Sequence, residues 1–133
     1  MKLHEAVAQN DLIEIINLLD NGADINQGLP KEYDGEGNTP LHLAAMHGSL
    51  AVTTLLIKRG AKIDSLNKLD ATPLICACHM PAARTDNIFC LIAAGANINW
   101  HTAKLGGHTP LSAAIDSSNN GISDFLRHIG ANT

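Results

Sequence analysis

Residues 39–64 read TPLHLAAMHGSLAVTTLLIKRGAKID, and modified copies of this stretch recur along the 133-residue chain. Its opening triplet, Thr39-Pro40-Leu41, returns as Thr72-Pro73-Leu74 and Thr109-Pro110-Leu111, so successive copies start 33 and 37 residues apart. A repeat of this period indicates one structural unit stacked on copies of itself. Such a stack is usually a surface for a partner rather than a pocket for a reaction, which already limits the functional interpretation.

The reference copy carries the chemistry of two short helices. Thr39 can cap the first helix, because its hydroxyl accepts a hydrogen bond from a free backbone N–H. Pro40 then occupies the first helical position, where a missing donor costs nothing. Apolar residues between Leu50 and Leu56 recur at helical spacing and predict the second helix. Gly60 follows its last turn and can adopt the left-handed conformation that closes a helix.

Four copies of this unit tile the chain. The first copy lacks Thr-Pro but keeps its other positions in register, with Leu3 at the place of Leu41. A Gly-Ala pair ends every copy: Gly22-Ala23, Gly60-Ala61, Gly95-Ala96 and Gly130-Ala131. We therefore expect a single domain over residues 1–133, divided into repeat 1 (1–38), repeat 2 (39–71), repeat 3 (72–108) and repeat 4 (109–133).

The segment Thr39-Pro40-Leu41-His42-Leu43-Ala44 resembles the T-P-L-H-x-A signature of the ankyrin repeat, and residues 72–77 and 109–114 lose only its histidine. The resemblance covers residues 3–132. It implies an all-α, L-shaped solenoid of four helix-turn-helix units with projecting hairpin-like loops. It also implies that the signature histidine makes a hydrogen bond between repeats, and that the chain is a non-enzymatic protein-protein interaction module.

Repeat 3 departs from the pattern in three ways. It has two extra residues near Pro81, Ile75 in place of the signature histidine, and Asp70 in place of the usual turn glycine. The stability of a solenoid is a sum of unit and interface terms, so one poor unit opens first. We therefore expect repeat 3 to be the least stable of the four.

The composition excludes several classes of partner. The net charge is −4 with only nine Lys and Arg residues and no basic stripe, which argues against nucleic acid and anionic membranes. The longest apolar run is far too short to span a bilayer. Three cysteines, an odd number, all fall in predicted helices, which is unlike a secreted disulfide framework. We expect a cytoplasmic protein, or one in the host cytosol if it is a secreted bacterial effector.

No motif in the chain predicts chemistry. Cys76-Ala77-Cys78-His79 invites a metal interpretation, but a structural zinc site normally needs four ligands and no second pair exists. The aligned positions are apolar helix sites, so buried packing cysteines are expected instead. Phosphate-binding, dinucleotide-binding and hydrolase motifs are absent from the sequence. We expect no enzyme activity, no cofactor, no metal and no small-molecule substrate.

The two longest loops carry the two residues most typical of binding hot spots. The connection from repeat 1 to repeat 2 is five residues longer than the next one and contains Tyr33, while the connection to repeat 4 contains Trp100. Trp100 either leads partner binding or packs back on its own loop, and the sequence leaves both open. Phe89 and Phe125 sit on second helices at spacing that predicts core positions.

By resemblance to the family, the expected binding face is a concave array of loop and first-helix residues. It comprises Tyr33, Glu36, Asn38, Met46 and His47 from repeat 2 and the connection before it, Leu66, Lys68, Leu69, His79 and Met80 from repeat 3 and the connection before it, and Trp100, Leu105, His108, Asp116 and Ser117 from repeat 4 and the connection before it. The expected partner is a protein. Two alternatives stay open: an inhibitor, immunity-type or regulatory subunit that blocks a partner enzyme, and the ankyrin portion of a larger effector or scaffold.

Overall fold

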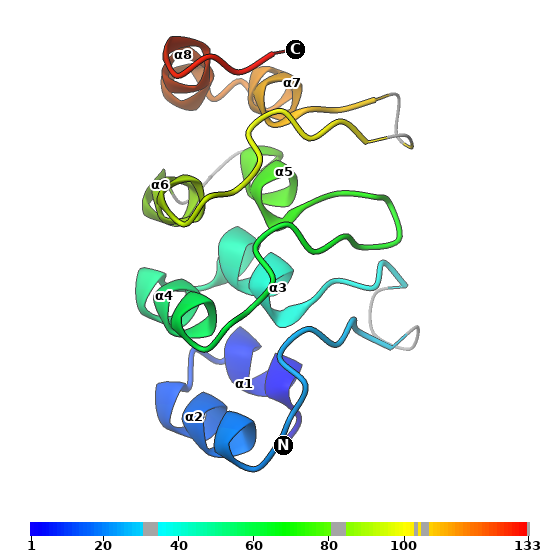
Figure 1. The fold of residues 1–133 in the computed structure, drawn as a ribbon, viewed down its shortest axis with the longest axis vertical. Coiled ribbons are helices and arrows are strands. Elements are labelled where there is room, and N and C mark those ends of the chain that lie inside the picture. Colours follow the sequence, from blue (N-terminus) through cyan, green and yellow to red (C-terminus); the bar gives the residue numbers. More distant parts are fainter. Residues whose placement is uncertain (31–34, 81–84, 103, 105–106, 133) are drawn as a thin grey trace.

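The computed structural model describes residues 1–30, 35–80, 85–102, 104 and 107–132, and within these ranges it holds eight helices and no strand. The helices are α1 (Leu3–Ala8), α2 (Leu12–Asp20), α3 (Pro40–His47), α4 (Leu50–Lys58), α5 (Pro73–Cys78), α6 (Thr85–Ala93), α7 (Pro110–Asp116) and α8 (Asn120–His128). They form two columns, with α1, α3, α5 and α7 in one and α2, α4, α6 and α8 in the other (Figure 1). The all-α solenoid predicted from the sequence is confirmed.

The helix ends are fixed by the residues that the repeat predicts. The side chains of Thr39, Thr72 and Thr109 each accept a hydrogen bond from the backbone N–H three residues on, and proline follows each of them. The glycine of every Gly-Ala pair has a φ between +90° and +98°. At Gly60 the N–H donates to the carbonyl of Ile57 and the next N–H to that of Leu56, which satisfies the last carbonyls of α4.

The core lies between the two columns and is aliphatic. Its largest fully buried side chains include Ile15, Leu41, Leu56, Leu74 and Leu126, each of which contributes about 1.5–3 kcal/mol through removal from water. Alanines on the first helices are equally buried, which lets each first helix lie close against the next. The stack therefore needs no large aromatic side chain at its centre.

Asparagine or aspartate at the end of each unit links it to the following one. The side-chain oxygens of Asn26, Asp64 and Asn99 accept hydrogen bonds from backbone N–H groups one repeat later, at 2.9, 3.0 and 2.7 Å. This regular series gives a physical reason for the Ile-Asp or Ile-Asn pair that closes the first three copies. It adds a directional, repeat-to-repeat contact to the apolar packing.

The signature histidine bonds the last residue before the next repeat, close to the inter-repeat contact that the family resemblance implies. The Nδ1 atom of His42 accepts from the backbone N–H of Thr39 at 3.1 Å, so the Nε2–H group can donate to the carbonyl of Ala71 at 2.8 Å. In repeat 4 the hydroxyl of Ser112 reproduces the first of these bonds, at 2.8 Å from the N–H of Thr109. In repeat 3, Ile75 is buried at the same position and packs instead.

The two phenylalanines do not occupy the core positions that the sequence predicts. Phe89 is 42% exposed and Phe125 is half-buried, and their rings meet edge to face with centroids 4.8 Å apart. They pack against each other on the outer side of α6 and α8, because the aliphatic side chains already fill the space between the columns. This contact ties repeat 3 to repeat 4 at the surface.

Candidate partner-binding groove

Three loops project to the same side of the stack, and we call them fingers: finger 1 (residues 27–38), finger 2 (65–71) and finger 3 (100–108) (Figure 1). One backbone hydrogen bond closes the base of each finger, from Leu29 to Asn38, from Asn67 to Ala71 and from Thr102 to His108, at 2.9, 3.2 and 2.9 Å. Each finger also has a residue with positive φ at its second-to-last position: Gly37, Asp70 and Gly107. Asp70 therefore adopts the left-handed turn without being a glycine.

The fingers are joined to one another by hydrogen bonds. The backbone N–H of Lys68 donates to the carbonyl of Glu36 at 2.8 Å, and the side-chain amide of Asn67 donates to the side-chain oxygen of Asn38 at 2.9 Å. The ammonium group of Lys104 donates to the carbonyl of Lys68 at 2.9 Å. The fingers therefore form a connected wall, which lowers the entropy lost when a partner binds.

Trp100 is part of this wall. Its indole N–H donates to the carbonyl of Asp70 at 2.8 Å, and its ring is half-buried against the core. The indole N–H is thus bonded within the chain and much of the ring is covered, which supports a packing role for Trp100. Its part in partner binding stays a prediction. The side chain fastens finger 3 to finger 2.

A pocket of about 210 Å3 lies between the fingers and the first helices of repeats 2 and 3, α3 and α5. Its lining is mainly apolar, with two histidines, a carboxylate and an amide. The lining residues are Glu36, Met46, Asn67, Leu69, Ala71, Ile75, Cys76, His79, Met80, Thr102 and His108. We call this pocket and its rim the concave groove. Methionine side chains adapt to irregular shapes and contact aromatic rings favourably, so the groove suits an apolar anchor.

The structure brings six of the predicted binding residues together around this pocket: Glu36, Met46, Leu69, His79, Met80 and His108. His47, Leu66 and Lys68 are exposed nearby in the chain but do not line the pocket. Asn38 is only 2% exposed, and its side chain bonds Glu36 and Asn67, so in the free chain it supports the fingers. Tyr33 and Leu105 lie outside the described residues.

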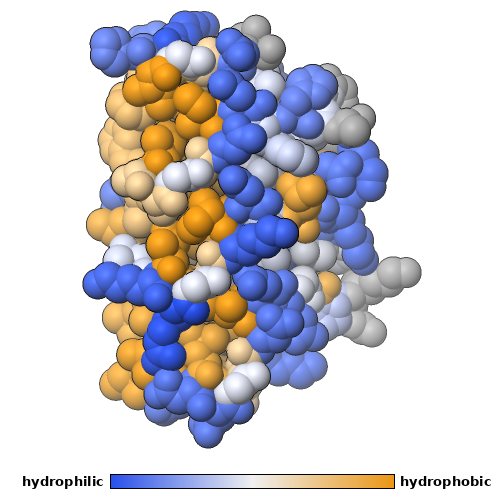
Figure 2. All heavy atoms as spheres, in the orientation of Figure 1, coloured by the Kyte–Doolittle hydropathy of each residue, from blue (hydrophilic) through white to orange (hydrophobic). Residues whose placement is uncertain are grey.

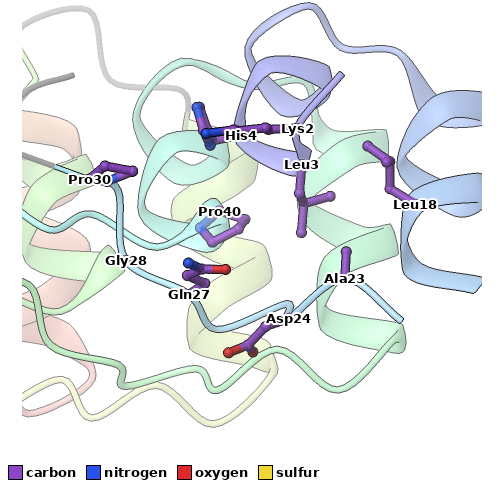
Figure 3. Close-up of a pocket in the computed structure, with 10 residues that line it drawn as sticks. All are labelled: Lys2, Leu3, His4, Leu18, Ala23, Asp24, Gln27, Gly28, Pro30 and Pro40. Atoms are coloured by element: carbon purple, nitrogen blue, oxygen red, sulfur yellow. The ribbon is translucent and has the colours of Figure 1, made fainter. Parts of the chain in front are cut away.

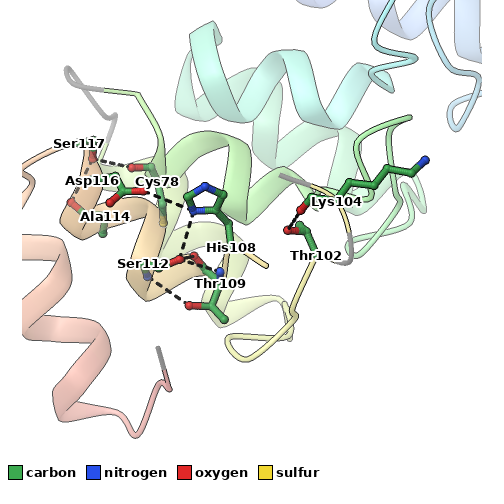
Figure 4. A network of polar contacts seen from close by, with 9 residues as sticks. All are labelled: Cys78, Thr102, Lys104, His108, Thr109, Ser112, Ala114, Asp116 and Ser117. Carbon is green, nitrogen blue, oxygen red and sulfur yellow. Dashed lines mark hydrogen bonds and ion pairs between the residues drawn. The ribbon is translucent and has the colours of Figure 1, made fainter. Parts of the chain in front are cut away.

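The remaining predicted residues, Asp116 and Ser117, end α7. Asp116 is exposed and its carboxylate lies 3.4 Å from Nδ1 of His108, which is also 3.3 Å from the hydroxyl of Ser112 (Figure 4). The hydroxyl of Ser117 contacts the carbonyls of Cys78 and Ala114, at 2.7 and 3.1 Å. Ser117 therefore joins repeat 4 to repeat 3, whereas Asp116 faces solvent beside the groove.

Two histidine rings meet at one edge of the groove. The centroids of His79 and His108 lie 4.8 Å apart in an edge-to-face arrangement. Burial and the neighbouring His108 lower the pKa of His79, whereas Asp116 acts in the opposite direction. The pair therefore favours the neutral form of His79 in the free protein.

The cysteines behave as packing groups. Burial raises the pKa of the Cys76 thiol to about 12, with a further increase from Glu36, and burial likewise raises that of Cys78 to about 12. Cys78 is fully buried, whereas Cys76 lines the groove and its sulfur lies 3.6 Å from the amide nitrogen of Asn67. In the described part of the chain, no three His, Cys, Asp or Glu side chains are grouped so that they could hold a metal ion.

A family model described as ankyrin repeats, in three copies, matches residues 3–102. The chain belongs to the ankyrin repeat family. Ankyrin repeats generally mediate protein–protein interactions. The match ends within finger 3, yet the helix pair that follows has the same threonine cap and the same terminal glycine geometry as the matched ankyrin units. None of the described helices has the length and apolar character needed to cross a membrane.

The ankyrin relatives are much longer proteins. An ankyrin repeat protein of fowlpox virus is 46% identical over 66 residues, covering 50% of this chain and 15% of that protein. A Danio rerio protein named as a palmitoyltransferase is 30% identical over 97% of this chain and 19% of its own length. The Gallus gallus nuclear factor NF-kappa-B subunit is 33% identical over 88% of this chain and 11% of its own. The chain thus spans less than a fifth of each of these relatives.

Sequence reasoning missed two other hollows in this ankyrin stack. One, of about 310 Å3, lies at repeat 1 and is lined by Lys2, Leu3, His4, Leu18, Ala23, Asp24, Gln27, Gly28, Pro30 and Pro40 (Figure 3). The available signal was the missing Thr-Pro pair: Lys2 takes the capping position of α1 and makes no side-chain cap. Neither the shape nor the charge of this hollow selects a ligand.

The second missed hollow lies on the outer side of α2 and α4. It measures about 480 Å3 and is lined by Leu12, Ile16, Leu50, Ala51, Thr54, Leu55 and Lys58. Figure 2 shows apolar atoms gathered on the side where the second helices lie, and hydrophilic atoms on the side of the fingers. The signal in the sequence was the apolar composition of α2, whose apolar residues occupy more than one face of the helix. Ile13 is one of them, and it is 74% exposed.

Proposed function

We propose that this chain is a non-enzymatic protein-binding module, and that the concave groove receives an apolar side chain of its protein partner. The observation that carries the proposal is the pocket itself, which gathers Met46, Leu69, Met80 and two histidines from segments far apart in the sequence. Apolar pockets with a few convergent polar groups are typical binding sites, and central anchors in such pockets dominate interface energies.

The fingers give the groove the rigidity that binding favours. Hydrogen bonds through Lys68, Asn67 and Trp100 hold the three fingers together in the free chain. Little ordering entropy then opposes association, so even a modest contact area can give useful affinity. The three cysteines are free thiols, which is consistent with the reducing cytosol as the compartment we propose.

The test is a selection of displayed random peptides on the wild-type chain, followed by affinity measurements on two matched variants. Met80→Glu places a charge in the groove, whereas Ile13→Glu places the same charge on the exposed outer side of α2. We expect Met80→Glu to weaken the selected peptides by about thirtyfold, since truncating or blocking an anchor site costs about 2 kcal/mol.

Ile13→Glu should leave the affinities within about threefold, because surface changes away from an interface are nearly neutral. Circular dichroism melts of both variants control for unfolding. Selected peptides that ignore Met80→Glu and respond to Ile13→Glu would show that the outer helix side binds partners and that the groove does not.

A further inference from the structure

Two imidazole rings form the polar edge of the concave groove, and they can still make hydrogen bonds to a partner. His79 is half-buried, lines the pocket and faces His108 edge to face at 4.8 Å. Within the described part of the chain neither ring nitrogen of His79 makes a hydrogen bond to another residue, whereas Nδ1 of His108 lies near Ser112 and Asp116. A partner group that enters the pocket therefore meets His79 as an available donor.

Fixed charges of both signs surround the groove. Lys68 lies on finger 2 between two lining residues, and Lys104 lies on finger 3 and donates to the carbonyl of Lys68. Three carboxylates oppose these two lysines: Glu36 on finger 1, Asp70 on finger 2 between two lining residues, and Asp116 at the end of α7. Because the fixed charges nearly cancel, protonation of the two imidazoles makes the groove positive.

We propose that the partner of this groove presents an acidic side chain next to its apolar anchor, so that the carboxylate bonds His79 and His108 while the anchor fills the pocket. This inference rests on the proposed function, because it assigns the chemistry of a partner to the same site. An acidic segment complements the groove best when the imidazoles are protonated, and a basic segment fits it worst in that state.

Protonation of His79 and binding of an acidic partner then favour each other. Burial and the neighbouring His108 lower the pKa of His79 in the free chain, so near neutral pH this ring is uncharged. A carboxylate within about 4–6 Å raises the pKa of a histidine by about one unit or more. By linkage, a rise of one unit makes binding about tenfold tighter at a pH below both values than at a pH above them.

Other groups that face or surround His79 do not produce this signature. The thiol of Cys76 on α5, whose pKa is raised to about 12, stays neutral throughout the range from about pH 7.5 to 5.5. Imidazole is the side chain whose ordinary pKa falls in that range. The other imidazoles close to the groove in the chain are His47, at the end of α3, and His101 on finger 3, whose ring lies against Gly107. Neither of them lines the pocket, so a group that enters it meets His79 and His108 instead.

The experiment uses the peptides selected on the wild-type chain at about pH 5.5 and sorted by their loss on Met80→Glu. The tightest groove-binding peptide and its Asp→Asn or Glu→Gln counterpart are measured by calorimetry at about pH 5.5 and 7.5. The chains compared are wild type, His79→Gln and His128→Gln. His128 is an exposed imidazole on α8, so its replacement is a matched control.

We expect the groove-binding peptides to be enriched in carboxylates and to bind more tightly at the lower pH, by a factor that approaches about tenfold as the pH falls below both pKa values. His79→Gln and the uncharged peptide should each clearly reduce this ratio, and His128→Gln should leave it intact. In the wild-type chain, the NMR titration of the His79 ring should move to higher pH when the peptide is bound, a readout that needs no variant.

Two results would overturn the inference in different ways. Peptides that depend on Met80 but lack carboxylates, or whose affinity is the same at both pH values, would refute the acidic partner and leave the groove as the binding site. Peptides that are all insensitive to Met80→Glu would remove the proposed function, and the inference with it.

Discussion

Replacing Trp100 by alanine should destabilise the stack rather than remove a binding contact. The indole is half-buried against the core and donates to the carbonyl of Asp70 at 2.8 Å. Removal of a fully buried tryptophan costs about 3–5 kcal/mol, and about half of that applies to a half-buried ring. We therefore expect Trp100→Ala to lower the free energy of unfolding by about 2 kcal/mol.

The hydrogen bond can be separated from the packing. Trp100→Phe keeps most of the ring but leaves the carbonyl of Asp70 without its donor, which should cost about 1 kcal/mol. For a chain of this size, 1 kcal/mol corresponds to a shift of roughly 3 °C in melting temperature. The alanine variant should therefore melt roughly 6 °C lower and the phenylalanine variant roughly 3 °C lower.

Urea titrations followed by circular dichroism measure both changes. Leu66→Ala is the control, because Leu66 is 42% exposed on the neighbouring finger 2 and should change stability by less than about 0.5 kcal/mol. If Trp100→Ala leaves the urea midpoint within the range of the Leu66→Ala control, the indole does not fasten the fingers. The reasoning from its contacts would then be refuted.

Three further predictions concern single side chains. Asp70→Gly should raise the urea midpoint and stabilise the chain by about 0.5 kcal/mol. Relief of the strained φ of 57° outweighs the extra conformational entropy that glycine gives the unfolded chain. Asp70→Ala should lower the midpoint. Folding lowers the pKa of His79, so its stabilising contribution is present above the unfolded pKa near 6.5 and is lost as the pH falls. His79→Gln should therefore flatten the dependence of the free energy of unfolding on pH between about pH 7 and 5. An unchanged slope in urea titrations would contradict this. Cys76 and Cys78 should resist iodoacetamide at about pH 8 in the native state and react after urea is added, which mass spectrometry can follow. Rapid modification of the native chain would show that the thiols are more ionised than their burial implies.

The fold was predictable because its determinants are local. Thr39 and Pro40 fix a helix start whatever surrounds them, and Gly60 fixes a helix end by its backbone freedom alone. The same short-range chemistry recurs in each copy, so reading one copy predicted the others. The histidine bond from His42 to Ala71 followed from the family resemblance and is present as expected.

The side-chain partners within the fingers were not predictable in this way. Trp100 meets Asp70 some thirty residues earlier, and Asn67 meets Asn38 at a similar separation, so both contacts depend on how neighbouring fingers stack. The sequence leaves Trp100 between two roles for that reason. Alignment to the reference copy places Asn38 on the expected binding face, and only the stacked geometry shows that its amide is enclosed.

The candidate groove was predicted in part. Alignment to the reference copy identified Met46, His79 and Met80 as variable residues of one face, and these do line one pocket. Alignment does not show how deeply a side chain is buried. It therefore could not separate the residues that line the pocket from exposed neighbours such as Lys68, or from residues that support the fingers. It also could not show that two histidines so far apart in the sequence would meet.

The most direct test of the account is a backbone amide NMR titration of the wild-type chain with a peptide selected by display. If the concave groove binds partners, the largest shift changes should fall on the amides of Met46, Leu69, His79, Met80 and His108, whose residues line one pocket. Changes centred instead on Leu12, Ile16 and Leu50, on the outer side of α2 and α4, would contradict the central claim.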